Sequence, residues 1–210
     1  MFLIKDLVYQ HVGQAQKPLN IPHWEATQGE QWLLLGKSGS GKTTLLHLLA
    51  GILSLKQGTI ELLNQPIHQW SAYRRDVFRG KNIGIIFQKS HLIPTLTISE
   101  NIRLPQFTVG AKIEASILKE VAETLQIEHC LPKMPSQVSQ GEAQRIAVAR
   151  AIVHQPALLL ADEPTASLDD DNAHQVALLL QKQAKIRQTT LVIATHDNRL
   201  KSLFDQQYSL

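Results

Sequence analysis

The sequence predicts an α/β fold with a mostly parallel sheet, a small antiparallel β lobe and a helical subdomain. The first observation is a glycine-rich loop at residues 36–44, between an apolar run and a helix-like segment. The second is the alternation of short apolar runs with amphipathic stretches, which is typical of a sheet covered by helices. The third is a region at about residues 95–134 that has helical spacing without strand signals.

The composition is that of an ordinary globular domain. The chain has 210 residues, of which 43% are hydrophobic and 19% are charged. We expect a single domain over residues 1–210. Its core, with the β lobe, is expected at residues 1–88 and 156–210, and its helical subdomain at residues 89–155.

Several classes of protein are excluded by the same composition. No apolar run approaches the roughly 20 residues that a membrane helix needs, and the N-terminus lacks the layout of a signal peptide, so we expect a cytoplasmic protein. The net charge of +3 comes without a long basic run, which argues against nucleic acid as a partner. The single cysteine, Cys130, excludes an intrachain disulfide and makes no cluster of cysteines for a metal; we expect a buried or half-buried thiol rather than a nucleophile.

Three strands are expected before the glycine-rich loop. Residues 3–9 are mostly apolar, and residues 19–24 alternate, although Pro22 weakens the second assignment. Residues 31–35 end in three consecutive leucines, which suits a strand buried on both faces of a parallel sheet. After the loop we expect a helix, then the elements at residues 58–63 (strand), 71–78 (helix) and 83–87 (strand).

The helical region begins with residues 97–102, which resemble a capped helix start, and continues with helical spacing over residues 113–125. A long helix is expected over residues 140–153, with Pro156 after its end. The alternation then resumes, with elements expected at residues 158–161 (strand), 172–184 (helix) and 190–194 (strand).

The glycine-rich loop has the complete pattern of a phosphate-binding P-loop. Its glycines let backbone N–H groups approach a phosphate, and the following helix directs its positive N-terminal end toward the same place. The Lys42 ammonium can bridge the β- and γ-phosphates, and the Thr43 hydroxyl can bind Mg²⁺. A flexible turn is the alternative, but it does not explain the full pattern. We therefore expect a nucleoside triphosphate to contact Gly36, Lys37, Ser38, Gly39, Ser40, Gly41, Lys42, Thr43 and Thr44.

Two carboxylates follow the apolar strand at residues 158–161. Asp162 stands where a P-loop protein holds Mg²⁺, often through water. Glu163, one residue further on, can project toward an attacking water and orient or deprotonate it. A solvated turn is the alternative, which the preceding apolar run and the P-loop disfavour.

The order of the short motifs resembles that of the ATP-binding-cassette (ABC) ATPases, a family of P-loop nucleoside triphosphatases. The resemblance spans nearly the whole chain, and its strength comes from the order, since each short piece alone is weak. The matching pieces are residues 36–44, Phe87-Gln88, Val138-Ser139-Gln140-Gly141-Glu142, residues 158–163, Ser167-Leu168-Asp169 and Thr195-His196-Asp197.

The resemblance implies roles for several polar residues. Gln88 would contact Mg²⁺ or the attacking water at the hinge to the helical subdomain, and His196 would hydrogen-bond the γ-phosphate. Asp169 would organise a dimer interface or cap a helix. Ser139 and Gly141, at the start of a helix, would contact the γ-phosphate bound by a second copy of the chain. Two ATP molecules would then lie between two chains arranged head to tail.

The sequence departs from the family pattern at two places. The usual signature is Leu-Ser-Gly-Gly-Gln, and Gln140 replaces its first glycine here, which could crowd the opposing nucleotide and lower activity. The aromatic residue that stacks on adenine falls by spacing near His11, with Tyr9 as the alternative.

Residues 88–102, together with Pro135 and Ser136, resemble the subgroup of lipoprotein release, macrolide export and cell division. This implies an ATPase subunit that drives a separate transmembrane permease. The subunit would be held on the inner face of the cell membrane by binding to that permease. A signalling or mechanotransmission ATPase, a soluble P-loop kinase or GTPase, and a weakly active nucleotide-binding module are the alternatives. The residues do not identify the transported substrate, the direction of transport or the permease.

Overall fold

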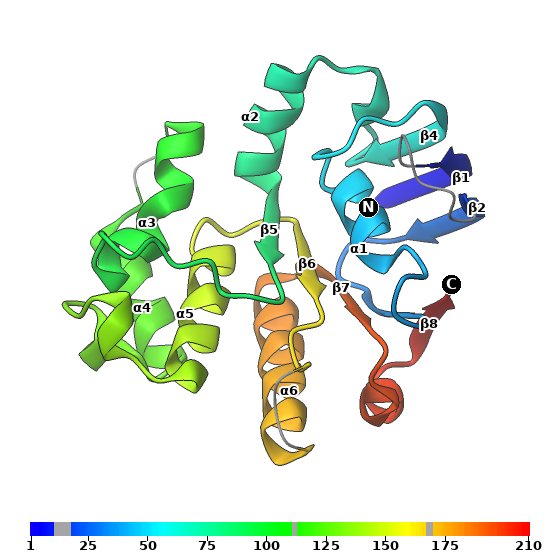
Figure 1. The fold of residues 1–210 in the computed structure, drawn as a ribbon. Coiled ribbons are helices and arrows are strands. Elements are labelled where there is room, and N and C mark those ends of the chain that lie inside the picture. The colour runs from blue at the N-terminus through cyan, green and yellow to red at the C-terminus, as the bar shows by residue number, and fades with distance from the viewer. Residues whose placement is uncertain (11–17, 111–112, 167–169) are drawn as a thin grey trace.

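The computed structural model describes residues 1–10, 18–110, 113–166 and 170–210. Figure 1 shows a central sheet with the small β lobe at one side and the helical subdomain at the other. The elements are β1 Phe2–Tyr9, β2 Leu19–Ala26, β3 Gln31–Leu35, α1 Lys42–Leu49, β4 Gln57–Leu62, η1 Ile67–Gln69, α2 Ala72–Asn82, β5 Ile83–Ile86, α3 Ile98–Val109, α4 Ala115–Thr124, η2 Glu128–Cys130, η3 Pro135–Gln137, α5 Gln140–Ile152, β6 Leu158–Asp162, α6 Asp170–Arg187, β7 Thr190–Thr195, η4 Asn198–Leu203 and β8 Gln206–Ser209.

The main sheet has the strand order β5-β6-β7-β3-β8, and all of its neighbouring pairs are parallel. The residues of β6 and β7 are all buried, because helices cover both faces of a parallel sheet. The carboxyl ends of parallel strands lie at one edge. The P-loop after β3, Asp162 at the end of β6 and Thr195 at the end of β7 therefore meet at that edge.

The β lobe is the antiparallel sheet β2-β1-β4. Pro22 lies in β2, which pairs only with β1 and is an edge strand in the described part of the sheet, so its missing N–H costs no sheet hydrogen bond on the open side. Trp24 stacks on Tyr208 of β8, with ring centroids 4.6 Å apart. This contact joins the β lobe to the main sheet.

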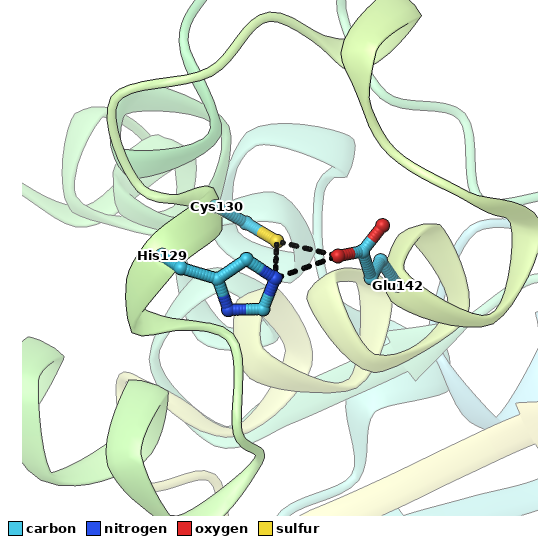
Figure 2. A group of neighbouring side chains, drawn as sticks. All are labelled: His129, Cys130 and Glu142. Carbon is cyan, nitrogen blue, oxygen red and sulfur yellow. Dashed lines mark hydrogen bonds and ion pairs between the residues drawn. The ribbon is translucent and has the colours of Figure 1, made fainter.

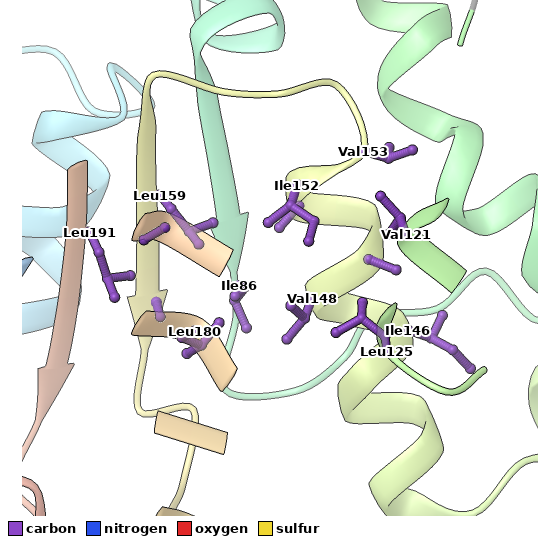
Figure 3. Close-up of a cluster of buried hydrophobic side chains, with 14 of the residues drawn as sticks. Ile86, Val121, Leu125, Ile146, Val148, Ile152, Val153, Leu159, Leu180 and Leu191 are labelled. Carbon is purple, nitrogen blue, oxygen red and sulfur yellow. The ribbon is translucent and has the colours of Figure 1, made fainter. Parts of the chain in front are cut away.

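The helical subdomain is built around α5. Figure 3 shows Val148 and Ile152 of α5 beside Ile86 and Leu159 of the sheet, with Val121 of α4 on the other side of the helix. At Gly84, an added Cβ would collide with the carbonyl oxygen of Ala151, so the absence of a side chain lets β5 approach α5 closely. The subdomain is thereby packed directly on the sheet.

The predicted α/β class is confirmed, with some differences in detail. Strand β8 was not predicted, because its four residues are mostly exposed and polar and lack alternation. Helix α2 runs to Asn82, directly into β5, which is beyond the end predicted at residue 78. Within the described residues, no helix is long and apolar enough to cross a membrane.

Candidate nucleotide site

The P-loop runs from β3 into α1 with the backbone that its glycines allow. Gly39 and Gly41 have φ values of +79° and +101°, a region that other residues rarely adopt. Gly41 is the N-cap of α1, so the positive N-terminal end of this helix faces the loop. The Ser40 hydroxyl is buried and has no hydrogen-bond partner within the described chain. The loop thus offers an anion one unpaired hydroxyl and the positive end of a helix.

Lys42 is the first residue of α1, and its side chain folds back into the loop. It is only 6% exposed. Its Nζ donates to the carbonyl oxygens of Gly36 at 2.8 Å and Lys37 at 3.2 Å, and it lies 3.2 Å from Glu163 Oε1. A buried ammonium is stable here because a carboxylate and two carbonyls surround it. Phosphate oxygens are chemically equivalent acceptors for it.

Thr43 and Asp162 meet across the gap between α1 and β6. Thr43 Oγ1 donates to Asp162 Oδ2 at 2.8 Å. Asp162 Oδ1 is buried and has no hydrogen-bond partner within the described residues. Burial raises the pKa of Asp162, although the Thr43 hydroxyl acts in the opposite direction. An unpaired carboxylate oxygen beside a threonine hydroxyl fits the oxygen ligands that Mg²⁺ prefers.

Glu163 follows β6 with a φ of +46°, in the left-handed region that costs a residue with a side chain of order 1 kcal/mol or more. Its N–H donates to the Ala194 carbonyl at 2.8 Å, which holds this turn against β7. Its side chain is 12% exposed and faces Lys42. The strained turn directs the carboxylate toward the P-loop.

The end of β7 holds the Glu163 carboxylate from the other side. Thr195 Oγ1 donates to Glu163 Oε2 at 2.9 Å, and His196 Nδ1 lies 2.9 Å from Oε1. Burial opposes ionisation of Glu163, but the hydrogen bonds from His196, Thr195 and Lys42 outweigh it and lower its pKa. Glu163 is therefore an anion at neutral pH. Thr195 was named from sequence only as part of the motif with His196 and was given no role, although its position at the end of a strand beside His196 was the available signal.

Other predicted residues lie outside this group of contacts. Gln88 is exposed in the loop after β5. Tyr9, at the end of β1, is partly buried against the core beneath the β lobe. His11 and Asp169 lie outside the described residues, so the structure does not address adenine stacking by His11 or the interface role of Asp169.

Ser139 and Gly141 lie at the N-terminus of α5. Ser139 is the N-cap: its Oγ accepts from the Glu142 N–H at 3.2 Å, and its hydroxyl donates to Glu142 Oε2 at 2.8 Å. Glu142 also accepts from the Ser139 N–H at 2.7 Å, which completes a capping box. Both Ser139 and Gly141 are exposed residues, and the Ser139 hydroxyl donates to Glu142 in this arrangement.

This P-loop site on a five-stranded parallel sheet, with a capped signature helix, defines a class of protein. Residues 19–166 match the model of the ABC transporter family, and the chain belongs to that family. It is an ATP-binding subunit of an ABC transporter and an ATPase, which confirms the predicted resemblance.

More specific similarities agree with the predicted subgroup. The chain is 40% identical over 196 residues to the lipoprotein-releasing system ATP-binding protein LolD of Colwellia psychrerythraea, which covers 92% of this chain and 76% of that protein. It is 39% identical to LolD of Shewanella denitrificans, over 87% of this chain and 79% of that protein.

Solved structures of ABC cassettes have the same fold. The dimeric structure of MJ0796, a bacterial ABC transporter cassette, has a TM-score of 0.88 at 26% identity, covering 100% of this chain and 94% of that one. A dimeric post-hydrolysis state of the same cassette, bound to ADP and Pi, has a TM-score of 0.85 at 28% identity with the same coverage.

Proposed function

We propose that two copies of this chain bind two Mg-ATP head to tail and drive a separate membrane permease of the lipoprotein-release type. By binding that permease, the chain would be held on the cytoplasmic face of the inner membrane. The dimeric form of the MJ0796 cassette and the similarity to LolD proteins support this proposal. Lipoproteins are the proposed class of substrate because the similarity to LolD extends over most of the chain.

The single observation that carries the ATPase mechanism is the Glu163 carboxylate, held between Lys42 and the end of β7. Glu163 is the proposed base or orienting group for the attacking water. It is ionised at neutral pH and its position is fixed from three directions. His196, whose other ring nitrogen is free of the Glu163 contact, is the proposed donor to the γ-phosphate.

Lys42 is the proposed phosphate ligand, together with the backbone amides of residues 36–44. Its ammonium contacts two carbonyls of the loop and Glu163. Phosphate oxygens would replace some of these acceptors. That exchange would release Glu163 from Lys42 and couple nucleotide binding to the freedom of the proposed base.

Thr43 and Asp162 are the proposed holders of Mg²⁺, and Gln88 is proposed to join them. The unpaired Asp162 Oδ1 and the neighbouring Thr43 hydroxyl make the pair suitable. The metal would supply charge neutralisation on the phosphates. Burial raises the pKa of Asp162 and so disfavours its anionic form, which a bound cation would stabilise.

Ser139 and Gly141 are proposed to contact the γ-phosphate held by the second copy. Helix α5 has 13 residues, and the positive end of its dipole would attract the phosphate. The Ser139 hydroxyl would turn from Glu142 to the phosphate. Gln140 is exposed in the first turn, and its backbone is helical, so it needs no glycine-like φ. The replacement of the usual glycine is therefore compatible with the helix.

The proposal is tested by comparing Glu163→Gln with Glu25→Gln, a matched change at an exposed glutamate of β2. We expect Glu163→Gln to bind ATP and to lower turnover by roughly 10²-fold or more, about 3 kcal/mol of barrier. Light scattering should then detect an ATP-dependent dimer. Unchanged turnover would refute the role of Glu163, and a monomer at saturating Mg-ATP would refute dimerisation by the chain alone. The Glu25→Gln variant should behave as wild type.

A further inference from the structure

Three side chains capable of binding transition metals meet beside the N-terminus of α5. His129 and Cys130 lie in η2, and Glu142 lies in the first turn of α5. His129 Nε2 is 2.7 Å from Glu142 Oε1, and Cys130 Sγ is 3.4 Å from that nitrogen and 3.3 Å from that oxygen. Figure 2 shows the three atoms closing a triangle. We propose that this triangle binds one soft divalent cation such as Zn²⁺.

The separations of the three atoms are close to those of a tetrahedral site. With Zn–S of about 2.3 Å and Zn–N and Zn–O of about 2.0–2.1 Å, tetrahedral ligand atoms lie roughly 3.3–3.6 Å apart. Both distances from Cys130 Sγ already fall in or near this range. The imidazole and the carboxylate must separate by roughly half an ångström. This needs only a small rotation of the His129 side chain, which is 58% exposed.

The donor set suits zinc and excludes magnesium. A thiolate, an imidazole and a carboxylate are the ligands that zinc uses, whereas Mg²⁺ requires oxygen ligands. On binding, the Cys130 S–H bond breaks, a sulfur–metal bond forms, and the proton leaves to solvent. The proton between His129 Nε2 and Glu142 Oε1 is lost to solvent, and the imidazole binds through Nε2 as the neutral tautomer with its proton on Nδ1. The thiolate and the carboxylate balance the charge of the cation, and water takes the open fourth position on the exposed side of His129.

The site is compatible with the helix cap that shares Glu142. Ser139 uses Oε2 of this carboxylate, through its N–H and its hydroxyl. The triangle uses Oε1, and Figure 2 shows the other oxygen directed away from the cluster. The cation therefore binds without breaking the capping box. It links η2 to α5 next to Ser139, which places a metal-dependent tether beside the signature serine.

The test uses Co²⁺ as a spectroscopic probe on the tag-free chain of 210 residues, without nucleotide. Cys130 is the only cysteine, so a thiolate-to-cobalt charge-transfer band can arise only at this site. We expect this band to saturate at one Co²⁺ per chain, to disappear on addition of Zn²⁺, and to be absent in Cys130→Ser. In His129→Ala we expect the affinity for Co²⁺ to fall at least roughly tenfold. This variant should fold, because His129 is exposed.

The matched control is His23→Ala. His23 is also an exposed histidine beside a glutamate, with its Nε2 3.6 Å from Glu25 Oε2, but it lies on β2 and has no role in the triangle. Its removal should leave the cobalt band and the Zn²⁺ affinity unchanged. The absence of a thiolate band in wild type would overturn the proposal. Equal Zn²⁺ affinity of wild type and His129→Ala in equilibrium dialysis, or saturation at one metal per two chains, would do the same.

Discussion

Replacement of Asn101 by alanine should destabilise the loop that precedes α3. Asn101 is fully buried, and its side chain makes four hydrogen bonds to the backbone of that loop. Its Oδ1 accepts from the Ile93 N–H at 2.7 Å, and its Nδ2 donates to the carbonyls of Ile93, Leu96 and Thr97 at 3.0–3.1 Å. One side chain thus fixes the chain between the proposed contact residue Gln88 and helix α3.

The expected loss of stability depends on which of the backbone groups bonded to Asn101 keep another hydrogen-bond partner. The Ile93 carbonyl also accepts from the Leu96 N–H, and the Thr97 carbonyl also accepts from the Asn101 N–H, so both stay bonded after truncation. The Ile93 N–H and the Leu96 carbonyl lose their described partner. An orphaned buried group costs about 1–3 kcal/mol. Because Ile93 is 39% exposed and water can reach this loop, we expect a loss near the lower end, about 2 kcal/mol in total.

The assay is urea unfolding of the nucleotide-free chain, with Asn20→Ala as the matched control on an exposed position of β2. The control should change the free energy of unfolding by less than about 0.5 kcal/mol. Asn101→Asp keeps an acceptor for the Ile93 N–H but places a buried carboxylate against carbonyls, so it should be less stable than Asn101→Ala at neutral pH. If Asn101→Ala were as stable as Asn20→Ala, the reasoning from these four bonds would be wrong.

Three further predictions concern the nucleotide site and the sheet. Lys42→Ala should weaken ATP binding by roughly 10- to 100-fold, measured by equilibrium dialysis, because the ammonium is replaced by an apolar group; near-normal binding would remove Lys42 from the site. Gly84→Ala should lower the free energy of unfolding by about 2 kcal/mol or more, because the new Cβ meets the Ala151 carbonyl; an unchanged thermal midpoint would contradict this. The lowered pKa of Glu163 makes its stabilising contribution complete above its ordinary pKa of 4.5, and this contribution is lost as pH falls through the lower folded value. The difference in free energy of unfolding between wild type and Glu163→Gln should therefore shrink below pH 4.5 in unfolding titrations. A difference that stays constant with pH would refute this contribution of Glu163.

The sequence predicted the elements that carry strong local patterns. Local sequence was sufficient to recognise three features: the leucines of β3, the buried run of β6 and the complete P-loop pattern. The meeting of Thr43 with Asp162 could also be foreseen, because the carboxyl ends of parallel strands share one edge. These features depend on short-range periodicity and on one topological rule.

Other features depend on contacts between distant segments and had no local signal. The left-handed backbone of Glu163 is fixed by a hydrogen bond to Ala194, which nothing near residue 163 in the sequence indicates. The proximity of His129 and Cys130 to Glu142 requires the packing of η2 against α5. Strand β8 pairs through its backbone, with mostly exposed side chains, so its sequence carries little hydrophobic pattern.

The position of β3 within the sheet has a consequence for how the chain folds. Gln31 pairs with Leu191, and Trp32 pairs with Gln206, so both neighbours of this strand come from far along the chain. During synthesis, its apolar side chains stay without sheet partners until β7 has left the ribosome. Such long-range pairing makes folding slow and leaves an aggregation-prone segment exposed in the meantime. Among the described strands, the one that presents the P-loop therefore waits longest for its sheet partners.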